Sequence, residues 1–242
     1  MRAYFSVFGA RFRMMLQYRA AAVAGFATQA FWGWIRVMIF FAFYASNPGA
    51  RPMTFPDLVT YIWLSQAFLA LLPWSMDRDI EALVRSGGLA YELARPVDIY
   101  GFWFFRNMAS RLGPALLRAL PMLVIAGLFF GLRAPAGPGA ALAWLAATLG
   151  ALLLGSAIAT LMSFSLLWTV SGEGIARLVP AMVTLLSGMI VPLPFFPSWS
   201  RPLLDFLPFR GLVDTPFRLY TGDIGPSQAL LPLIHQVLWT LA

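Results

Sequence analysis

The sequence predicts an all-α membrane protein with six transmembrane helices, an N-terminal interfacial amphipathic helix and a re-entrant helical pair before the last span. Its composition is the first reason, because 60% of the 242 residues are hydrophobic and 11% are charged, against roughly 45–50% and about 25% in ordinary soluble domains. Apolar runs close to the ~20 residues that cross a bilayer also recur along the chain. Finally, the arginines fall mainly between these runs.

Five apolar runs are long enough to cross the hydrocarbon core, and a sixth is incomplete. They are about Ala20 to Ala45, about Leu58 to Met76, within Ile99 to Leu132, within Gly139 to Val170, about Leu178 to Val191, and from near Ala229 onward. The last run stops at Ala242 without a charged flank. We expect either a short final helix or a natural chain that continues beyond residue 242. Residues 20–242 then form one six-span transmembrane domain.

Residues 1–19 precede the first run and are predicted to form an interfacial helix. At 100° per residue, one side carries Phe5, Phe8, Phe12, Met15 and Leu16, and the other carries Arg2, Ser6, Arg13 and Gln17. Such a helix lies in the headgroup plane with its arginines toward anionic lipid. An extended cytoplasmic start to the first span is the alternative.

The distribution of arginine predicts the orientation, because positively charged loops stay in the cytoplasm. With the N-terminus inside, ten arginines fall on the inner side and five on the outer side, while Arg36 and Arg118 lie within spans. We therefore expect a multi-pass membrane protein with a cytoplasmic N-terminus. The formal charge of +7 marks a membrane boundary and does not indicate a nucleic-acid partner.

Residue counts exclude several kinds of catalytic site within the chain. All 17 basic residues are arginine, there is no cysteine, and His235 is the single histidine. A P-loop needs its lysine, and zinc sites need several histidine or cysteine ligands. We expect no catalytic residue, no metal and no cofactor in this chain. For His235 itself, we expect a structural hydrogen bond near the outer interface.

The longest polar interruption covers residues 77–98 and is predicted to face the cytoplasm. Asp77 or Asp79 can cap a short helix through Val84, which the Gly87–Gly88 pair ends. Its mixed-sign surface suits a soluble partner, although a solvated loop is an equal alternative. The candidate contact residues are Arg78, Asp79, Glu81, Arg85, Glu92 and Arg95.

Residues 191–226 are too apolar for an ordinary outer loop and too rich in proline for one span. A pair of short helices that enters the outer leaflet and returns fits this pattern, provided that protein or water satisfies the freed backbone groups. We expect Trp199 and Tyr220 at the membrane interface, where such aromatic residues gather.

Three segments resemble a known family of membrane proteins. They read LSGMIVPLPFFPSWSRPLLDFLPF (186–209), DTPFRLYTG (214–222) and RSGGLAYELARPVDIYGFW (85–103). Together they resemble the permease subunits of type-2 ATP-binding-cassette (ABC) exporters, closest to the bacterial type-2 family transporter proteins. The resemblance spans nearly the whole chain and says nothing about the cargo.

The resemblance implies a division of labour between several chains. Residues 77–95 would form a coupling helix inserted into a groove of an ABC ATPase, and a surface helix from Tyr4 to Tyr18 would brace it. Two ATPase copies would bind ATP and Mg, and a second permease, a related chain or a copy, would complete the translocation path. Two other classes stay open: an ion- or proton-coupled secondary carrier, and a membrane anchoring or assembly protein.

The fourth run carries a small residue at every fourth position, which permits close helix approach in lipid. The stripe comprises Ala143, Ala147, Ala151, Gly155, Ala159 and Ser163. A helix of the same chain is the expected partner, and a second permease is the alternative.

Charged residues within spans are costly and therefore attract functional interest. Arg36 could line the translocation path or snorkel outward, and snorkelling is slightly favoured. Arg111 and Arg118 lie seven residues apart on one helix face. We expect both to meet lipid phosphates or carboxylates near the inner surface, and Arg118 is also a candidate for the path.

Overall fold

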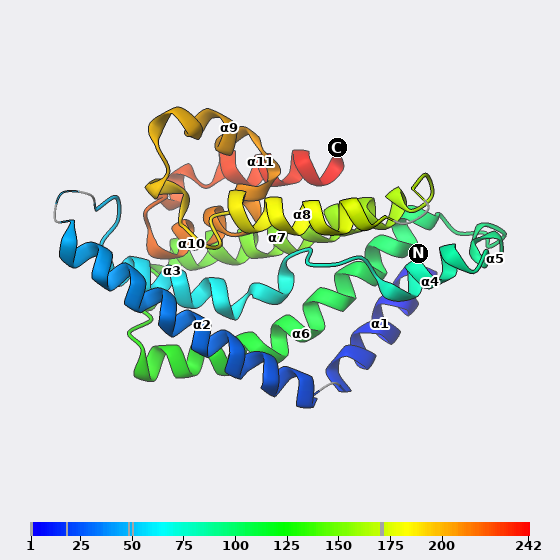
Figure 1. The fold of residues 1–242 in the computed structure, drawn as a ribbon, viewed down its shortest axis with the longest axis horizontal. Coiled ribbons are helices and arrows are strands. Elements are labelled where there is room, and N and C mark those ends of the chain that lie inside the picture. The colour runs from blue at the N-terminus through cyan, green and yellow to red at the C-terminus, as the bar shows by residue number, and fades with distance from the viewer. Residues whose placement is uncertain (1, 18, 48, 50, 170–171) are drawn as a thin grey trace.

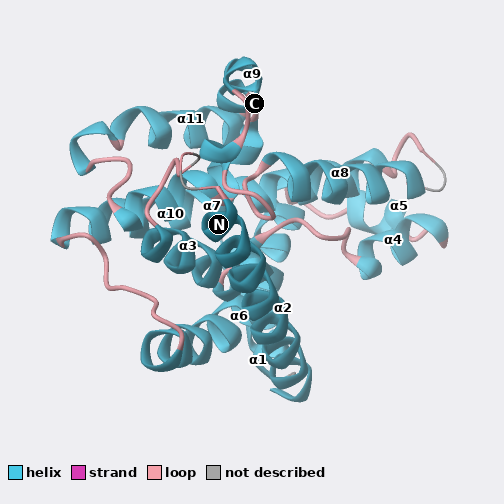
Figure 2. Ribbon diagram, turned by 60° about the vertical axis from the view of Figure 1, so that its left-hand side comes forward, coloured by secondary structure: helices cyan, strands magenta, loops and turns pink. Residues whose placement is uncertain are grey.

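A computed structural model describes residues 2–17, 19–47, 49, 51–169 and 172–242 (Figure 1). Every regular element in these ranges is a helix (Figure 2). The α-helices are α1 (Arg2–Gln17), α2 (Arg19–Ser46), α3 (Phe55–Ala67), α4 (Arg78–Arg85), α5 (Leu89–Leu93), α6 (Ile99–Phe129), α7 (Pro138–Ser165), α8 (Glu173–Leu186), α9 (Arg201–Phe206), α10 (Asp214–Thr221) and α11 (Leu230–Leu241). Short 3-10 turns are η1 (Leu69–Leu71), η2 (Leu193–Phe195), η3 (Ser198–Ser200), η4 (Pro208–Leu212) and η5 (Pro226–Gln228). The expected helix end at Tyr18 and span end at Val170 lie outside the described residues.

Three helices in the described ranges, α2, α6 and α7, are long and apolar enough to cross a membrane. The other three expected spans contain shorter helices: α3 has 13 residues, α8 has 14 and α11 has 12. A helix of 14 residues rises about 21 Å, less than the ~30 Å hydrocarbon core. Helix length thus confirms the first, third and fourth expected spans and leaves a count of six unconfirmed.

The shorter helices still follow the direction that six passes require. In Figure 1, α2, α6 and α8 run toward the end that carries the α2–α3 loop, and α3, α7 and α11 run back. α4 and α5 project from the opposite end, beside the start of α8, in both views (Figures 1 and 2). One end of the bundle is therefore formed by α4 and α5 and the other by the connections around α10.

The core surrounds α3, whose ten residues from Leu58 to Ala67 are all buried. A hydroxyl cap from Thr54 and a proline in the first turn start this helix, as helix N-termini favour. α10 packs between α3 and α7, and Tyr61 of α3 meets Phe217 of α10 edge-to-face at 5.5 Å. An ordinary polar-faced helix could not occupy this site, because no side of α3 is open to solvent beyond its first turn.

The small-residue stripe of α7 faces elements of its own chain. Ala147, Ala151, Gly155 and Ala159 are all buried. A Cβ at Gly155 would lie 2.8 Å from the backbone oxygen of Leu71, so glycine lets the chain after α3 approach closely. This placement agrees with packing inside one chain.

Residues 191–226 fold into several short helices and not into one simple pair. α9 is largely exposed, whereas α10 is buried among α3 and α7. Trp199 is 81% exposed, as an interfacial residue would be, but Tyr220 is 6% exposed. Tyr220 faces its own chain, because its hydroxyl donates to the Arg133 carbonyl at 2.8 Å and its ring packs on Trp144, and its place at the membrane interface stays a prediction.

Candidate functional site

The polar end of the bundle is built by α4 and α5, and local sequence accounts for both helices. The Asp77 carboxylate accepts a hydrogen bond from the Asp79 backbone N–H at 2.9 Å and so caps α4. α4 ends at Arg85, followed by Gly87 at φ +74°, a conformation that glycine adopts without strain. The predicted cap and the predicted break are both confirmed.

Four charged side chains from three segments converge behind α4. Asp77 accepts hydrogen bonds from Arg106 Nε at 2.7 Å and from Arg11 at 3.2 Å. Asp79 accepts from Arg11 at 2.9 Å and also from Arg106. Because Arg11 lies on α1 and Arg106 on α6, this charge cluster fastens the start of α4 to both helices.

Asp77 is the anchor of this charge cluster, and its side chain is 2% exposed. Burial alone would raise the pKa of Asp77, but the hydrogen bonds and charge of Arg106, together with the charge of Arg11, hold that pKa below its ordinary value. The carboxylate is therefore ionised at neutral pH, where it stabilises both guanidinium groups.

α1 contacts the far end of the loop as well. The backbone N–H of Asp98 donates to the Tyr4 hydroxyl at 3.1 Å, and Asp98 caps α6. The Tyr4 ring stacks on Phe105 of α6 at 5.7 Å. α1 thus touches both ends of residues 77–98.

The remaining predicted contact residues lie on the open side of the loop. Glu81 pairs with Arg85 at 2.8 Å, and Glu92 pairs with Arg95 at 2.8 Å. Both pairs are local, as neighbours on a helix form them. α5 adds two apolar side chains to this surface, Tyr91 at 81% exposed and Leu93 at 61%.

The opposite side of α4 is seated on the bundle. Ile80 is 3% exposed. Val84 packs against a cluster formed by Met76, Met162 and Leu166, which the first turns of α8 also contact. α4 is therefore linked to α1 and α6 by ion pairs, and to α7 and α8 by apolar contacts. A displacement of α4 would act on all four helices.

The two predicted intramembrane arginines have other partners than the charge cluster at Asp77. Arg36 donates to the Ser65 hydroxyl at 2.8 Å and to the Ile190 carbonyl at 3.0 Å. These contacts join α2, α3 and the chain after α8, which does not fit snorkelling. Arg118 instead lies against Gly25 of α2 and lines a cavity of about 360 Å³ with Trp74 and Met189.

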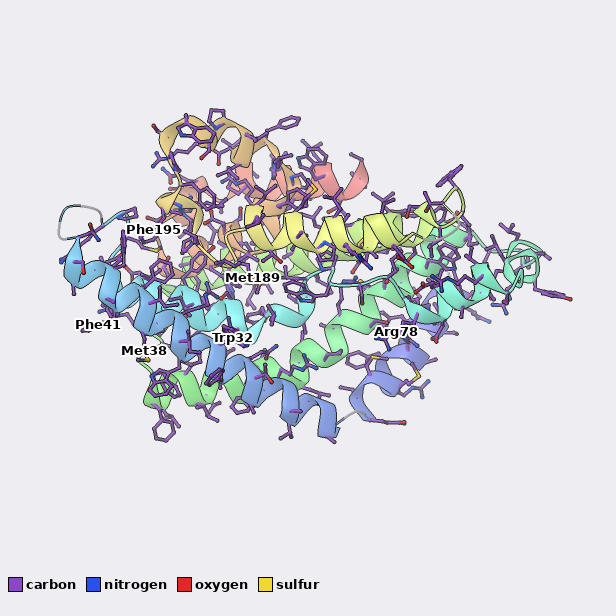
Figure 3. The ribbon with its side chains drawn as sticks, viewed as in Figure 1. Trp32, Met38, Phe41, Arg78, Met189 and Phe195 are labelled. Carbon is purple, nitrogen blue, oxygen red and sulfur yellow. The ribbon has the colours of Figure 1, made fainter. Side chains whose placement is uncertain are left out.

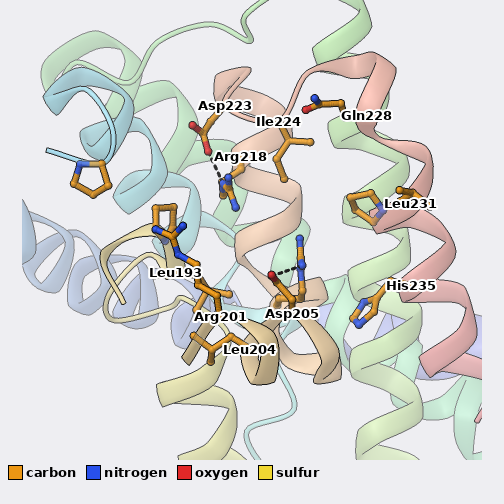
Figure 4. A pocket seen from close by; sticks show the side chains of 14 residues that line it. Leu193, Arg201, Leu204, Asp205, Arg218, Asp223, Ile224, Gln228, Leu231 and His235 are labelled. Carbon is orange, nitrogen blue, oxygen red and sulfur yellow. Dashed lines mark hydrogen bonds and ion pairs between the residues drawn. The ribbon is translucent and has the colours of Figure 1, made fainter. Parts of the chain in front are cut away.

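A larger cavity, of about 790 Å³, lies at the other end of the bundle between η2, α9, α10 and α11 (Figure 4). Its walls carry the ion pairs Asp205–Arg210 and Asp223–Arg218 (Figure 4). His235 Nε2 lies 3.0 Å from the Phe206 carbonyl, which is the structural hydrogen bond expected for it.

Sequence reasoning missed Arg11 and Arg106 as site residues. Both were counted only as inner-side charges, although a capping carboxylate next to a membrane surface needs cationic neighbours if it is buried. The position of Arg106 could have identified it as a partner of Asp77. It lies two turns into α6, close to the loop of residues 77–98 that precedes this helix. No local pattern connects Arg11 with Asp77, which is 66 residues away.

Comparison with known proteins gives one family match. A family model described as "ABC-2 family transporter protein" matches residues 31–242. No curated protein and no solved structure matches the chain.

Proposed function

The chain belongs to the ABC-2 transporter family, and from that premise we propose that it is the transmembrane permease subunit of an ATP-driven exporter. It is a membrane transport subunit and not an enzyme, and its family works with ABC ATPases. The observation that carries the proposal is the charge cluster at Asp77. It fastens the exposed helix α4 to the bundle, so that an ATPase bound to α4 could move the helices behind it.

In this proposal, ATP and Mg are bound by two ATPase copies. Their closure moves α4 and α5, which occupy a groove on each ATPase. The Asp77 cluster links this movement to α6 and α1, because each carboxylate is held by two guanidinium groups. The permease then rocks against a second permease, a related chain or a copy, and the translocation path changes the side to which it opens.

The proposed topology has six passes with the N-terminus in the cytoplasm of a bacterial inner membrane. α3, α8 and α11 complete their passes with the non-helical segments that adjoin them. Their alternating direction supports this topology (Figure 1), and backbone groups in such segments are tolerable where protein covers them. Residues 77–98 then face the ATPase, and residues 191–226 face outward.

α2 offers the surface that best suits a second permease. Trp32, Met38 and Phe41 along α2 are each more than half exposed (Figure 3). By contrast, the α7 stripe is covered by its own chain. We therefore place the contact between permeases on α2.

Exchange of Glu81 and Arg85 tests coupling. The double variant Glu81→Arg/Arg85→Glu keeps an i,i+4 ion pair and hence the helix, but it reverses both charges toward the ATPase. The complex purified from its native membrane is expected to lose most of its vanadate-sensitive ATP hydrolysis. The matched control exchanges Glu173 and Arg177, an exposed i,i+4 pair on α8. Full hydrolysis in the Glu81/Arg85 variant would contradict the proposal.

Labelling tests the topology, and the chain has no cysteine of its own. Ser86→Cys and Ser198→Cys place single thiols at exposed positions. A membrane-impermeant maleimide is expected to modify the first only in inverted vesicles and the second only in right-side-out vesicles. Modification of Ser86→Cys from outside would overturn the orientation.

A further inference from the structure

A cavity of about 550 Å³ lies beside the charge cluster, between α1, α6 and the segment that leads into α4. Its polar wall includes Arg11, Arg78 and Arg111, together with Asp77 and Asp79. The apolar wall includes Met14, Met15, Leu72 and Trp74. Arg78 marks the end of the bundle at which the cavity lies (Figure 3).

The two aspartates do not neutralise the arginines around this cavity. Arg11 and Arg106 already occupy both carboxylates. Within the described ranges, no ion pair includes Arg78 or Arg111. Four arginines against two aspartates leave two positive charges at this site.

Arg111 is the more informative of the two free cations. It is 6% exposed. Among the described residues, its guanidinium donates only to Asn107, to the backbone oxygen at 2.8 Å and to the side-chain oxygen at 3.3 Å. Its buried Nε has no partner in the described part of the chain. A buried cation with only neutral partners is costly unless an anion pairs with it.

We infer that this cavity binds a phosphate group, namely that of an anionic phospholipid head group. The planar guanidinium matches two phosphate oxygens, and Arg78 at the exposed side supplies a second cation. The methionines and Trp74 provide an apolar surface for the start of the acyl chains. Free phosphate shares the charge but leaves that apolar wall without a partner. The inference needs only membrane residence and does not depend on coupling to an ATPase.

Lipid retention measures this site directly. The full chain, purified in mild detergent and stripped of lipid, is incubated with dioleoylphosphatidylglycerol or dioleoylphosphatidylcholine and analysed by native mass spectrometry. The wild type is expected to retain phosphatidylglycerol preferentially. Arg111→Gln should lower that retention about tenfold, the loss expected for charged hydrogen bonds.

Two further variants keep the test decisive. Arg78→Gln changes an exposed residue, so it should lower lipid retention without endangering the fold. If Arg111→Gln elutes as aggregate, Arg78→Gln alone tests whether the cavity binds the lipid. Arg177→Gln, an exposed arginine at the same end of the bundle, should bind lipid as the wild type does. Unchanged retention in the soluble cavity variants would overturn the site. Displacement of the lipid by millimolar inorganic phosphate would overturn the lipid as its occupant.

Discussion

Two buried aspartates, one at each end of the bundle, begin a helix and pair with arginine, yet they hold different things together. Asp77 joins side chains from α1, α4 and α6. Asp214, at 1% exposed, joins backbone: its carboxylate accepts from the Leu193 N–H at 3.2 Å, and its own N–H donates to the Ser187 carbonyl at 3.1 Å.

The difference lies in what each aspartate holds, backbone groups around Asp214 and arginine side chains around Asp77. Around Asp214, the Tyr61 hydroxyl donates to the Gly188 carbonyl at 3.0 Å and lies 3.3 Å from the carboxylate. Those bonds fix the ends of α8 and α10 against α3. The Asp77 cluster instead joins α4 to α1 and α6 through the long side chains of Arg11 and Arg106. We call the contacts around Asp214 the lock, and the Asp77 charge cluster together with α4 and α5 the joint.

Removal of the lock is expected to have the largest effect on stability. Asp214→Ala leaves Arg218 without one carboxylate partner and the Leu193 N–H unpaired, a change that costs about 3–5 kcal/mol in buried pairs. Scanning fluorimetry in detergent should show an unfolding midpoint lower by on the order of 10 °C. Asp205→Ala is the control. Because the Asp205 side chain is 59% exposed, this variant should shift the unfolding midpoint little. Equal shifts would show that buried Asp214 contributes no more to stability than an exposed aspartate does.

A pair of glycine substitutions sharpens the same comparison. Gly188 has φ +86°, and a Cβ there would lie 2.5 Å from the Tyr61 hydroxyl. Gly188→Ala therefore combines backbone strain with a lost hydrogen bond, about 3 kcal/mol together. Gly87 has φ +74° with no atom within 4 Å of that position, so Gly87→Ala should cost about 1–2 kcal/mol. Thermal unfolding of both variants measures the difference between their losses of stability. That difference would vanish if the turn at Gly188 could shift to accommodate the added methyl group.

The joint should depend on pH in a defined direction. Because the pKa of Asp77 is lowered in the folded protein, its stabilisation is present above the unfolded pKa of about 3.9. It is lost as the pH falls through the lower folded value. Asp77→Asn should unfold more easily than the wild type at pH 7, by about 2 kcal/mol, and this difference should shrink below about pH 4. A difference that stays constant down to pH 3 would show that the charge of Asp77 contributes nothing.

The smallest effect on stability is expected at the tip of the joint. Tyr91→Ala removes an exposed ring and should change the unfolding midpoint by less than about 2 °C. Aromatic anchors carry much of the affinity at interfaces, so retention of the ATPase during purification should fall about tenfold. Ser86→Ala, at an exposed position outside the apolar surface of Tyr91 and Leu93, serves as the control. Undiminished retention in Tyr91→Ala would place the ATPase contact elsewhere.

Sequence alone accounted for everything that local chemistry decides. Composition and run length indicated a helical membrane protein, and the long helices α2, α6 and α7 follow the predicted runs. The cap at Asp77 and the end of α4 before Gly87 were also predictable, since each depends on residues within one turn.

Tertiary structure alone decided which distant groups meet. Hydropathy placed Arg36, Tyr220 and Asp77 near surfaces or within spans, but it could not identify Ser65, Arg133 and Arg106 as their partners. The same limit applies to α3, where an apolar run predicts a span while the helix stops at Ala67. The physical reason is that a side chain's neighbours across the bundle depend on how whole helices pack. That packing is a sum of many weak contacts, and no short stretch of residues records it.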